Sequence, residues 1–271
     1  MRSMPDEALN IAAVQMDIAW EDPPSNYQRV SRLLQTQPPG PGSLIILPEM
    51  FPTGFSMNLD HTAENASLAP SLSAEFLRQL ASDYQCAVLG GITTRNSQGK
   101  GQNEAVAFAP DGRLLCRYRK IQPFSLSGEA EAFSPGTDTC AFEWQGVRIA
   151  PLICYDLRFP EWFRRGAADG AELYPVIASW PMARIQHWVT LLQARAIENL
   201  AYTVGVNRIG TDPSFRYTGR TLIANPHGDI VMDAGDRETV LHHRLEISSL
   251  REWRKKFPAL RDRKDRLDQP T

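Results

Sequence analysis

A short apolar segment that ends in a cysteine constrains this chain more than any other feature of its sequence. Residues 147–153 are almost entirely apolar, and Cys154 follows them directly, ahead of the segment 155–160. A short apolar run of this kind is typical of a buried strand. A thiol at the point where such a strand ends is held by rigid backbone and can still face a pocket. The sequence therefore predicts a core strand that presents Cys154 at its end.

Two further segments have the same form. The apolar run 44–47 leads into Glu49, and a strand-like segment that begins at Leu114 leads into Lys120. A carboxylate, an ammonium group and a thiol are thus each expected at a strand end, and together they can perform acyl transfer as base, oxyanion donor and nucleophile. Taken alone, Cys154 would be interpreted as a buried core thiol, Glu49 as a loop carboxylate and Lys120 as a solvated strand end. Only the combination favours catalysis.

Strand-like and helix-like segments alternate along the chain to about residue 250. Strands are expected at 10–20, 44–47, 87–94, 147–153, 173–179, 202–209 and 239–247, helices at 26–37, 73–84, 159–168 and 186–201, and hairpins at 104–120 and 220–234. The alternation predicts an α/β layered fold, and the hairpins require antiparallel pairs as well. A mixed sheet, or two sheets packed face to face, satisfies both. Because no Ser/Gly-rich linker interrupts the pattern, we expect one domain over residues 1–271, with its core at about 9–250 and a charged tail at 251–271.

The composition excludes several classes of protein. The chain has 271 residues, 22% charged, with a formal net charge of -2, which gives no overall indication of nucleic-acid or membrane binding. Residues 1–7 lack the apolar stretch of a signal peptide, and no apolar run reaches transmembrane length, so a cytoplasmic protein is expected. The segment 251–268 carries eight Lys/Arg and four Asp/Glu. This mixture favours a solvated tail or a subunit contact over a nucleic-acid arm.

The cysteines and histidines give no indication of a metal site. The four cysteines are Cys86, Cys116, Cys140 and Cys154, without CxxC spacing. Free thiols in a reducing compartment are expected, and the three other than Cys154 are expected to be buried small hydrophobes. None of the five histidines has metal-ligand spacing, and the chain lacks glycine-rich phosphate loops and a GxSxG elbow. A Cys–His hydrolase that uses His187 is an alternative, but the position of His187 beside Trp188 at the beginning of a helix favours capping or packing.

At its strand-end residues the chain resembles the nitrilase superfamily of carbon–nitrogen hydrolases. Residues 47–51 are similar to the superfamily's glutamate motif, 118–121 to its lysine motif and 152–160 to its nucleophile motif, in the right order and with spacings of 71 and 34 residues. The resemblance extends over about residues 9–260. Further segments resemble the omega-amidase branch, which includes the bacterial 2-oxoglutaramate amidase: 178–181, Arg184, 187–188, 194–199, 207–210 and 256–260.

This resemblance implies a four-layer α-β-β-α sandwich that is usually dimerised through helices, and a reaction that needs neither a metal nor an organic cofactor. It assigns the catalytic roles to Glu49, Lys120 and Cys154. Members of the superfamily often carry a second glutamate after the lysine. Glu129 is the candidate for that position and Glu131 is its rival, while a surface carboxylate is the plainer interpretation of either one.

The implied function is hydrolysis of the terminal amide of a small 2-oxo acid to the acid and ammonia through a cysteine thioester. Glu49 would deprotonate Cys154, and Lys120 and the Tyr155 N–H would stabilise the oxyanion. Replacing Lys120 by alanine is then expected to remove activity without unfolding the protein. A deaminated-glutathione amidase and a broader aliphatic amidase or nitrilase are alternatives. A catalytically silent binding protein on the same fold is another, although the intact triad speaks against it.

A substrate of this class also carries a carboxylate, which requires a cation or N–H donors. Arg158 and Arg184 are the candidates on sequence position. A structural ion pair with a neighbouring acidic residue is at least as good an interpretation of Arg158. Trp180 and Phe124 are candidate pocket walls, although aromatic residues more often belong to the core.

Overall fold

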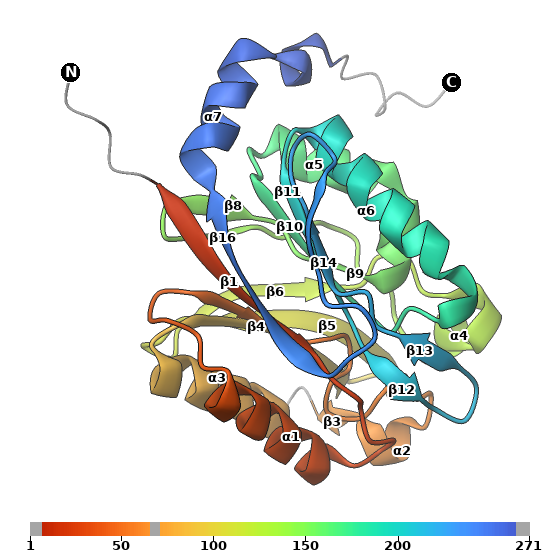
Figure 1. Cartoon of the computed structure of the whole chain (residues 1–271). Coiled ribbons are helices and arrows are strands. Elements are labelled where there is room, and N and C mark those ends of the chain that lie inside the picture. The colour runs from red at the N-terminus through yellow and green to blue at the C-terminus, as the bar shows by residue number, and fades with distance from the viewer. Residues whose placement is uncertain (1–6, 66–70, 264–271) are drawn as a thin grey trace, which may run out of the picture.

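The computed structural model describes residues 7–65 and 71–263, and two mixed sheets stacked face to face form its centre (Figure 1). The first sheet has the order β16-β1-β2-β4-β5-β6, with β3 paired to β4. β2 is parallel to β1 and β4, whereas β16, β5 and β6 are each antiparallel to their neighbours. β6 therefore runs in the same direction as β2, so their carboxyl ends lie at one edge. The strands are β1 Ala8–Gln15, β2 Leu44–Ile46, β3 Glu64–Asn65, β4 Ala87–Arg95, β5 Gly101–Phe108, β6 Leu114–Arg119 and β16 Thr239–Glu246.

The second sheet has the order β15-β14-β11-β10-β8-β7, with β9 paired to β10. β8, β9 and β11 are all parallel to β10. The prediction of one strand over 147–153 is wrong in detail, because the chain leaves the sheet at Ala150 and at Pro151, which has no N–H to donate to a ladder. The strands are β7 Phe142–Trp144, β8 Val147–Ile149, β9 Leu152–Ile153, β10 Leu173–Ala178, β11 Tyr202–Asn207, β14 Leu222–Ala224 and β15 Ile230–Asp233.

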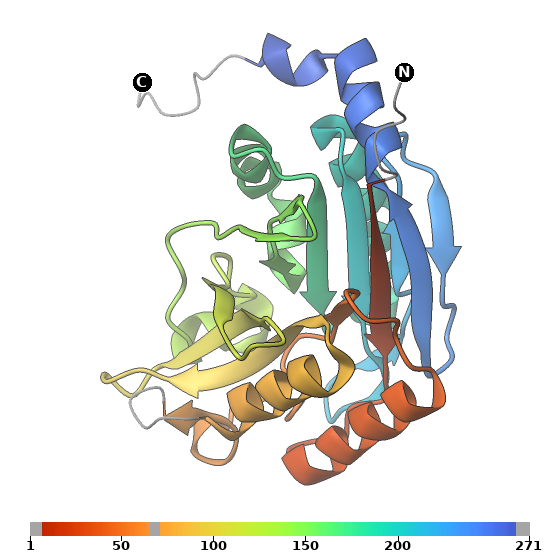
Figure 2. The same cartoon turned by 90° about the vertical axis from the view of Figure 1, so that its left-hand side faces the viewer.

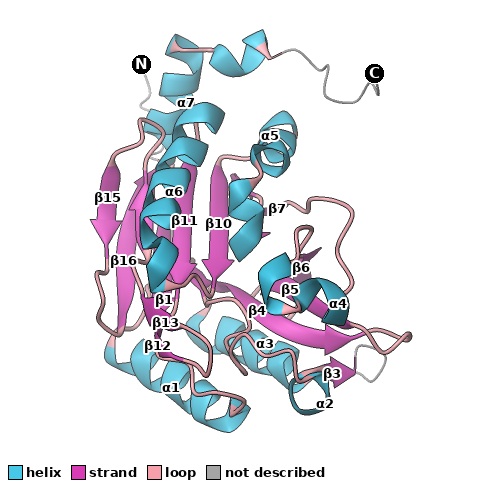
Figure 3. Cartoon of the chain, turned by 90° about the vertical axis from the view of Figure 1, so that its right-hand side faces the viewer, coloured by secondary structure: helices cyan, strands magenta, loops and turns pink. Residues whose placement is uncertain are grey.

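Helices cover the outer faces of both sheets. α1 and α3 lie on the first sheet, and α5 and α6 lie on the second, where α6 crosses β11 (Figures 2 and 3). The predicted four-layer α-β-β-α sandwich is thereby confirmed. No helix in the described part of the chain is long and apolar enough to cross a membrane. The helices are α1 Pro23–Thr36, α2 Leu59–Thr62, α3 Leu72–Tyr84, α4 Glu129–Ala132, α5 Pro160–Ala168, α6 Ile185–Asn199 and α7 Ile247–Lys256, and the 3-10 turns are η1 Ser125–Ser127, η2 Cys154–Arg158, η3 Met182–Arg184 and η4 Ala259–Asp262.

Alternate residues of the first sheet belong to different layers of the core. On β1, Ile11 and Ala13 pack in the cluster that the two sheets share, whereas Ala12 and Val14 pack in the cluster that contains Leu77 and other residues of the outer helices. Successive strand side chains point to opposite faces, so a strand that is covered on both faces must be apolar throughout. This explains why the central strands could be predicted from continuous apolar runs.

The charged C-terminal segment begins as a docked helix. Residues 251–256 belong to α7, where Arg251 forms an ion pair with Glu172 at 2.7 Å. Arg254 donates hydrogen bonds to the backbone carbonyl of Leu200 at 2.7 Å and to that of Ala171 at 2.6 Å. Residues 251–256 therefore form a helix that is packed on the body of the protein through Arg251 and Arg254, and residues 264–271 lie outside the described residues.

Two of the four cysteines are paired. Cys116 on β6 and Cys140 before β7 form a disulfide, with Cα atoms 6.5 Å apart, as such a bond requires. The prediction of free thiols is wrong for this pair and correct for Cys86 and Cys154. The two paired residues are 24 positions apart in the chain, and their proximity arises only when the segment after α4 returns to β6.

Candidate active site

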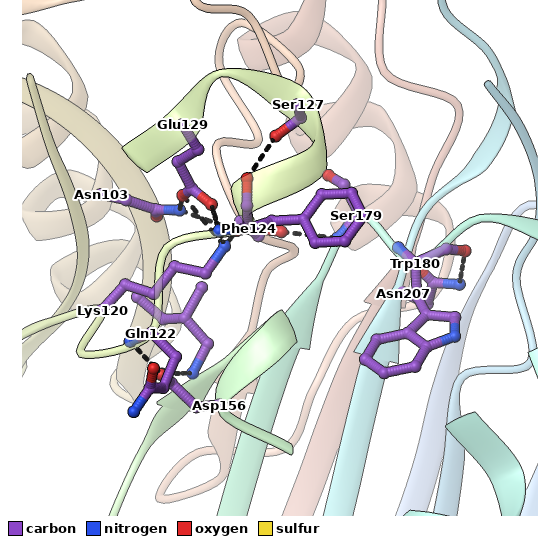
Figure 4. A network of polar contacts seen from close by, with 12 residues as sticks. Asn103, Lys120, Gln122, Phe124, Ser127, Glu129, Asp156, Ser179, Trp180 and Asn207 are labelled. Atoms are coloured by element: carbon purple, nitrogen blue, oxygen red, sulfur yellow. Dashed lines mark hydrogen bonds and ion pairs between the residues drawn. The ribbon is translucent and has the colours of Figure 1, made fainter. Parts of the chain in front are cut away.

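The ends of strands from both sheets meet at one place, and the three predicted catalytic side chains lie there. Glu49 follows β2, Lys120 follows β6 directly, and Cys154 follows β9 directly. Figure 4 shows Lys120 and Glu129 pointing toward each other, with Asn103 beside them and Ser179 across the site. The carboxyl ends of strands are where α/β sheets commonly hold ligands. The topology therefore brings these residues together, as the sequence analysis predicts.

Both carboxylate oxygens of Glu49 are engaged. Oε1 accepts hydrogen bonds from Asn103 Nδ2 at 2.7 Å and from Lys120 Nζ at 3.1 Å, and Oε2 accepts one from the Ser179 backbone N–H at 2.8 Å. Glu49 is fully buried, and these bonds offset the cost of burying its charge. The loop that carries Glu49 packs directly on Gly91. Position 91 must be glycine, because a Cβ there would lie 2.6 Å from the Cα of Glu49.

Lys120 is buried between two carboxylates. Its Nζ lies 3.1 Å from Glu49 Oε1 and 3.0 and 2.8 Å from the two oxygens of Glu129, below the ring of Phe55 at 5.3 Å from the centroid. Burial acts to lower the pKa of Lys120, but the charges of Glu129, Glu49 and Cys154 outweigh it and raise the pKa above its ordinary value. The side chain is therefore a fixed cation at neutral pH.

The second glutamate of the site is Glu129. It is fully buried, and its Oε2 accepts hydrogen bonds from Lys120 Nζ at 2.8 Å and from the Phe124 backbone N–H at 2.6 Å. Glu131 is exposed to solvent on the same short helix. The structure therefore brings Glu129 to the lysine and leaves Glu131 outside the site.

Asn103 joins the two glutamates, and it was not predicted from the sequence. Its Nδ2 donates to Glu49 Oε1 at 2.7 Å and to Glu129 Oε1 at 2.9 Å, and its backbone carbonyl accepts the Lys120 N–H at 2.9 Å. Asn103 is almost completely buried near the beginning of β5. It directly precedes the hairpin predicted at 104–120, so nothing in the sequence indicated that its amide would be buried and would need partners.

Cys154 is the first residue of η2, at the point where the chain turns sharply after β9. Its φ of 45° lies in the left-handed region, which costs a non-glycine residue about 1–2 kcal/mol. Burial raises the pKa of the thiol well above its ordinary value, and so do the charges of Glu49 and Glu129, while Lys120 and the Ser179 N–H act in the opposite direction. The group is therefore a neutral thiol at rest, and it needs a base before it can attack.

A buried carboxylate ties the ends of the two strands that carry the lysine and the cysteine. Asp156 Oδ1 accepts the Gln122 N–H at 2.9 Å, and Oδ2 accepts the Ile153 N–H at 3.0 Å and the Tyr118 hydroxyl at 2.7 Å. Burial raises the pKa of Asp156 to about 6, although its hydrogen bond from Tyr118 lowers it. Because Gln122 follows β6 and Ile153 ends β9, this side chain fixes the two strand ends against each other.

A small pocket, partly open to solvent, lies at Cys154. Phe124 and Trp180, the predicted walls, line it, and Tyr155 does too, while Phe55 and Phe215 were not predicted. The pocket is thus mainly aromatic, and its thiol faces a space suited to a small organic substrate.

Two guanidinium groups enter this pocket from η2 and η3. Arg158 lies over the Trp180 ring, 4.9 Å from its centroid, and Arg184 lies over Phe124 at 5.3 Å. The carboxylate of Asp156 is bound by other donors, so it does not pair with Arg158. Within residues 7–65 and 71–263, neither guanidinium has an acidic partner. Two positive charges are therefore available to an anionic ligand.

His187 lies beside Arg158 and not beside the thiol. Its Nδ1 is 3.2 Å from Arg158 Nη2, and no contact in the described ranges joins its ring to Cys154. The Cys–His alternative therefore lacks geometric support. Among the residues that the structure describes, no group of three or more His, Cys, Asp or Glu side chains could hold a metal ion.

The chain is similar in sequence and in structure to known carbon-nitrogen hydrolases. The family model described as carbon-nitrogen hydrolase matches residues 10–255. The omega-amidase YafV of Yersinia enterocolitica is 37% identical, over 94% of this chain and 96% of that protein. The 2-oxoglutaramate amidase of Bacillus subtilis is 30% identical, over 94% and 98%. Among solved structures, XC1258 of Xanthomonas campestris, a CN-hydrolase superfamily protein with an arsenic adduct in its active site, superimposes with a TM-score of 0.89 at 32% identity, covering 97% of this chain and 99% of that one.

Proposed function

This chain belongs to the carbon-nitrogen hydrolase family, and from that membership we propose that it is an omega-amidase. The reaction would convert the terminal amide of a small 2-oxo acid, such as 2-oxoglutaramate, into the acid and ammonia. One observation carries the proposal: a neutral buried thiol and a Lys120 cation held between Glu49 and Glu129 lie at a pocket with two guanidinium groups to which the described residues offer no acidic partner. The names of the relatives support the substrate class.

In the first half of the reaction, Glu49 accepts the proton of the Cys154 thiol. Because the pKa of this thiol is raised, Glu49 is needed as the base that takes its proton when the sulfur attacks the amide carbon. The C–S bond forms, and the amide carbonyl becomes an oxyanion. Glu49 then returns the proton to the departing nitrogen. The C–N bond breaks, ammonia leaves, and a thioester remains on Cys154.

In the second half, water replaces the amide nitrogen. Glu49 removes a proton from water as the hydroxyl oxygen attacks the thioester carbon, and the C–S bond breaks with return of the proton to the sulfur. Lys120 Nζ and the Tyr155 N–H stabilise the oxyanion in both halves, and Glu129 holds Lys120 in place. An oxyanion donor of this kind is worth about 10²–10³ in rate.

The two guanidinium groups account for the acid end of the substrate. A 2-oxo acid presents a carboxylate and a ketone oxygen side by side, which two guanidinium groups can bind with charge-assisted hydrogen bonds. The aromatic walls suit the short apolar chain between this end and the amide. An anionic amide is therefore favoured over a neutral aliphatic amide or a nitrile.

The test is ammonia release from 2-oxoglutaramate, with glutamine, succinamate, deaminated glutathione and a simple nitrile measured alongside. We expect 2-oxoglutaramate to give the largest kcat/KM. Turnover of deaminated glutathione or a neutral amide in its place would retain the hydrolase and reject the substrate class. Rapid trapping of Cys154 by these compounds without turnover would instead indicate a binding protein.

Replacement of Arg184 by alanine should lower kcat/KM for 2-oxoglutaramate by roughly 10- to 100-fold, because a charge-assisted hydrogen bond to the substrate is lost. A neutral amide of equal length has no carboxylate to bind, so its kcat/KM should change little. Arg158→Ala, measured on the same two substrates, shows how much the second guanidinium group contributes to binding of the substrate carboxylate. An equal loss on both substrates would show that Arg184 supports the fold of the pocket rather than the carboxylate.

We also propose that the protein acts in the cytoplasm as a homodimer or a larger homo-oligomer. The Cys154 nucleophile must stay reduced to act, which favours a reducing compartment, although the Cys116–Cys140 disulfide is of a kind that is rare there. Ile197 on α6 and Phe257 after α7 are large apolar side chains that are about half exposed, which is consistent with a helical contact between subunits. Light scattering after size exclusion should give a mass above that of one chain, and a monomer over the working concentration range would reject the assembly.

A further inference from the structure

A small hairpin outside both main sheets reaches the pocket. Its strands are β12 Ile209–Thr211 and β13 Arg216–Thr218, and they lie just beyond the carboxyl end of β11, near α1 (Figure 3). Residues 212–215 form its turn. Phe215 at the end of that turn lines the pocket at Cys154 and is only partly buried. Its ring is therefore part of the pocket wall and not of the hydrophobic core.

The turn that carries Phe215 is closed by one side chain. Asp212 Oδ1 accepts the backbone N–H groups of Ser214 and Phe215, both at 2.7 Å, and Oδ2 accepts the Tyr217 hydroxyl at 2.5 Å. The Asp212 N–H in turn donates to the Phe215 carbonyl at 2.9 Å. The backbone on both sides of the Phe215 side chain is thus fixed within the turn.

A buried arginine holds the hairpin to the body of the protein. Arg208 is completely buried, and its guanidinium lies 4.5 Å from the centroid of the Tyr217 ring. Its Nη2 donates to the carbonyl of Ile18 at 3.0 Å and to that of Thr211 at 3.2 Å. The ring of Phe215 meets the Tyr217 ring edge-on, with centroids 6.5 Å apart. Phe215 therefore stands on a rigid support.

We propose that Phe215 sets the upper limit on the length and bulk of the acyl chain that the pocket accepts. The proposal rests on the amide hydrolysis described above. The other aromatic walls follow strands of the two sheets or belong to η2, so the hairpin supplies a wall of its own. A rigid aromatic ring in the wall of the pocket leaves less room for each methylene group that is added to the acyl chain. Discrimination against one methylene group in an apolar pocket is worth roughly 10- to 200-fold.

The experiment measures kcat/KM for a series of 2-oxo acid ω-amides that differ by one methylene group, starting from 2-oxoglutaramate. In Phe215→Ala, the ratio of the longer amide to the shorter one should rise by about 10-fold or more over the wild-type ratio. Phe215→Leu should give an intermediate rise, and Phe215→Trp should lower the ratio. Arg216→Ala, on the exposed neighbouring position, is the matched control and should leave the ratio unchanged.

Tyr217→Phe tests the support separately, because it removes the hydroxyl that donates to Asp212 and leaves the Phe215 side chain intact. It should raise the same ratio by a smaller factor than Phe215→Ala. Equal changes for all amides in the Phe215 variants would show that the ring controls entry or folding and would overturn the proposal. If the wild type hydrolyses the series and the ratio stays constant in every variant, this inference fails alone. If the wild type hydrolyses none of the amides, the proposed function fails and takes this inference with it.

Discussion

Replacement of Cys154 by alanine is expected to abolish ammonia release, with kcat falling by about 10⁶-fold, the loss that follows removal of a nucleophile from a comparable triad. No other thiol can take over, because among the described residues only Cys86 is also free, and it is buried elsewhere in the cluster shared with the outer helices. The remaining oxyanion donors would be left without a covalent intermediate to stabilise. Ammonia release under substrate excess measures the effect.

Cys86→Ala is the matched control for this variant. It removes the other free, buried thiol, so it reproduces the loss of a small buried side chain without touching the site. It should keep wild-type turnover per folded molecule. A second readout is covalent: intact mass of the wild type quenched during turnover should show the acyl group on the protein, and Cys154→Ala should not. Appreciable turnover by Cys154→Ala would reject the thioester mechanism.

The strand-end residues could be predicted because the patterns that identify them are local. Apolar runs identify the strands before Glu49 and Cys154, and the strand before Lys120 is one arm of a predicted hairpin. Their proximity needed the structure, because Glu49 and Lys120 follow strands of one sheet and Cys154 follows a strand of the other, so the stacking of the two sheets brings the thiol to the other two groups. The roles of these residues were inferred from the motif resemblance, and the distances between them are known only from the structure.

The partners of these residues could not be predicted, because they come from distant parts of the chain. Asn103 is 54 residues from Glu49, and Ser179, whose N–H binds the other oxygen of the same carboxylate, is 130 residues from it. No local pattern encodes such contacts. Phe215 was missed for a related reason, since its hairpin interacts with the pocket and with the body of the protein rather than with a strand of either sheet.

The choice between Glu129 and Glu131 also required the backbone. The two residues are separated by one position on a short helix, and two steps along an α-helix turn a side chain by about 200°. One of them must therefore face the lysine when the other faces solvent. Composition and spacing are the same for both, so only the orientation of α4 decides between them.

Replacement of Lys120 by methionine is expected to lower kcat by at least about 10²–10³-fold, because the main oxyanion donor is lost. The structure also changes what is expected of stability. Loss of activity without unfolding is expected from the sequence alone, but Lys120 is the cation that compensates the fully buried Glu49 and Glu129. Removing one partner of a buried ion pair typically costs about 3–5 kcal/mol, so the variant should also be markedly less stable. Denaturant unfolding measures this loss.

A second substitution separates the two effects. Glu129→Gln in the Lys120→Met background removes one of the two stranded charges and keeps an amide that can still accept the Phe124 N–H. This double variant should recover much of the lost stability and none of the lost turnover, because the oxyanion donor is still absent. Recovery of both would mean that Lys120 acts only by keeping the site folded. A single Lys120→Met variant as stable as the wild type would mean that the two carboxylates become protonated at little cost, and the ion-pair account of the site would then be wrong.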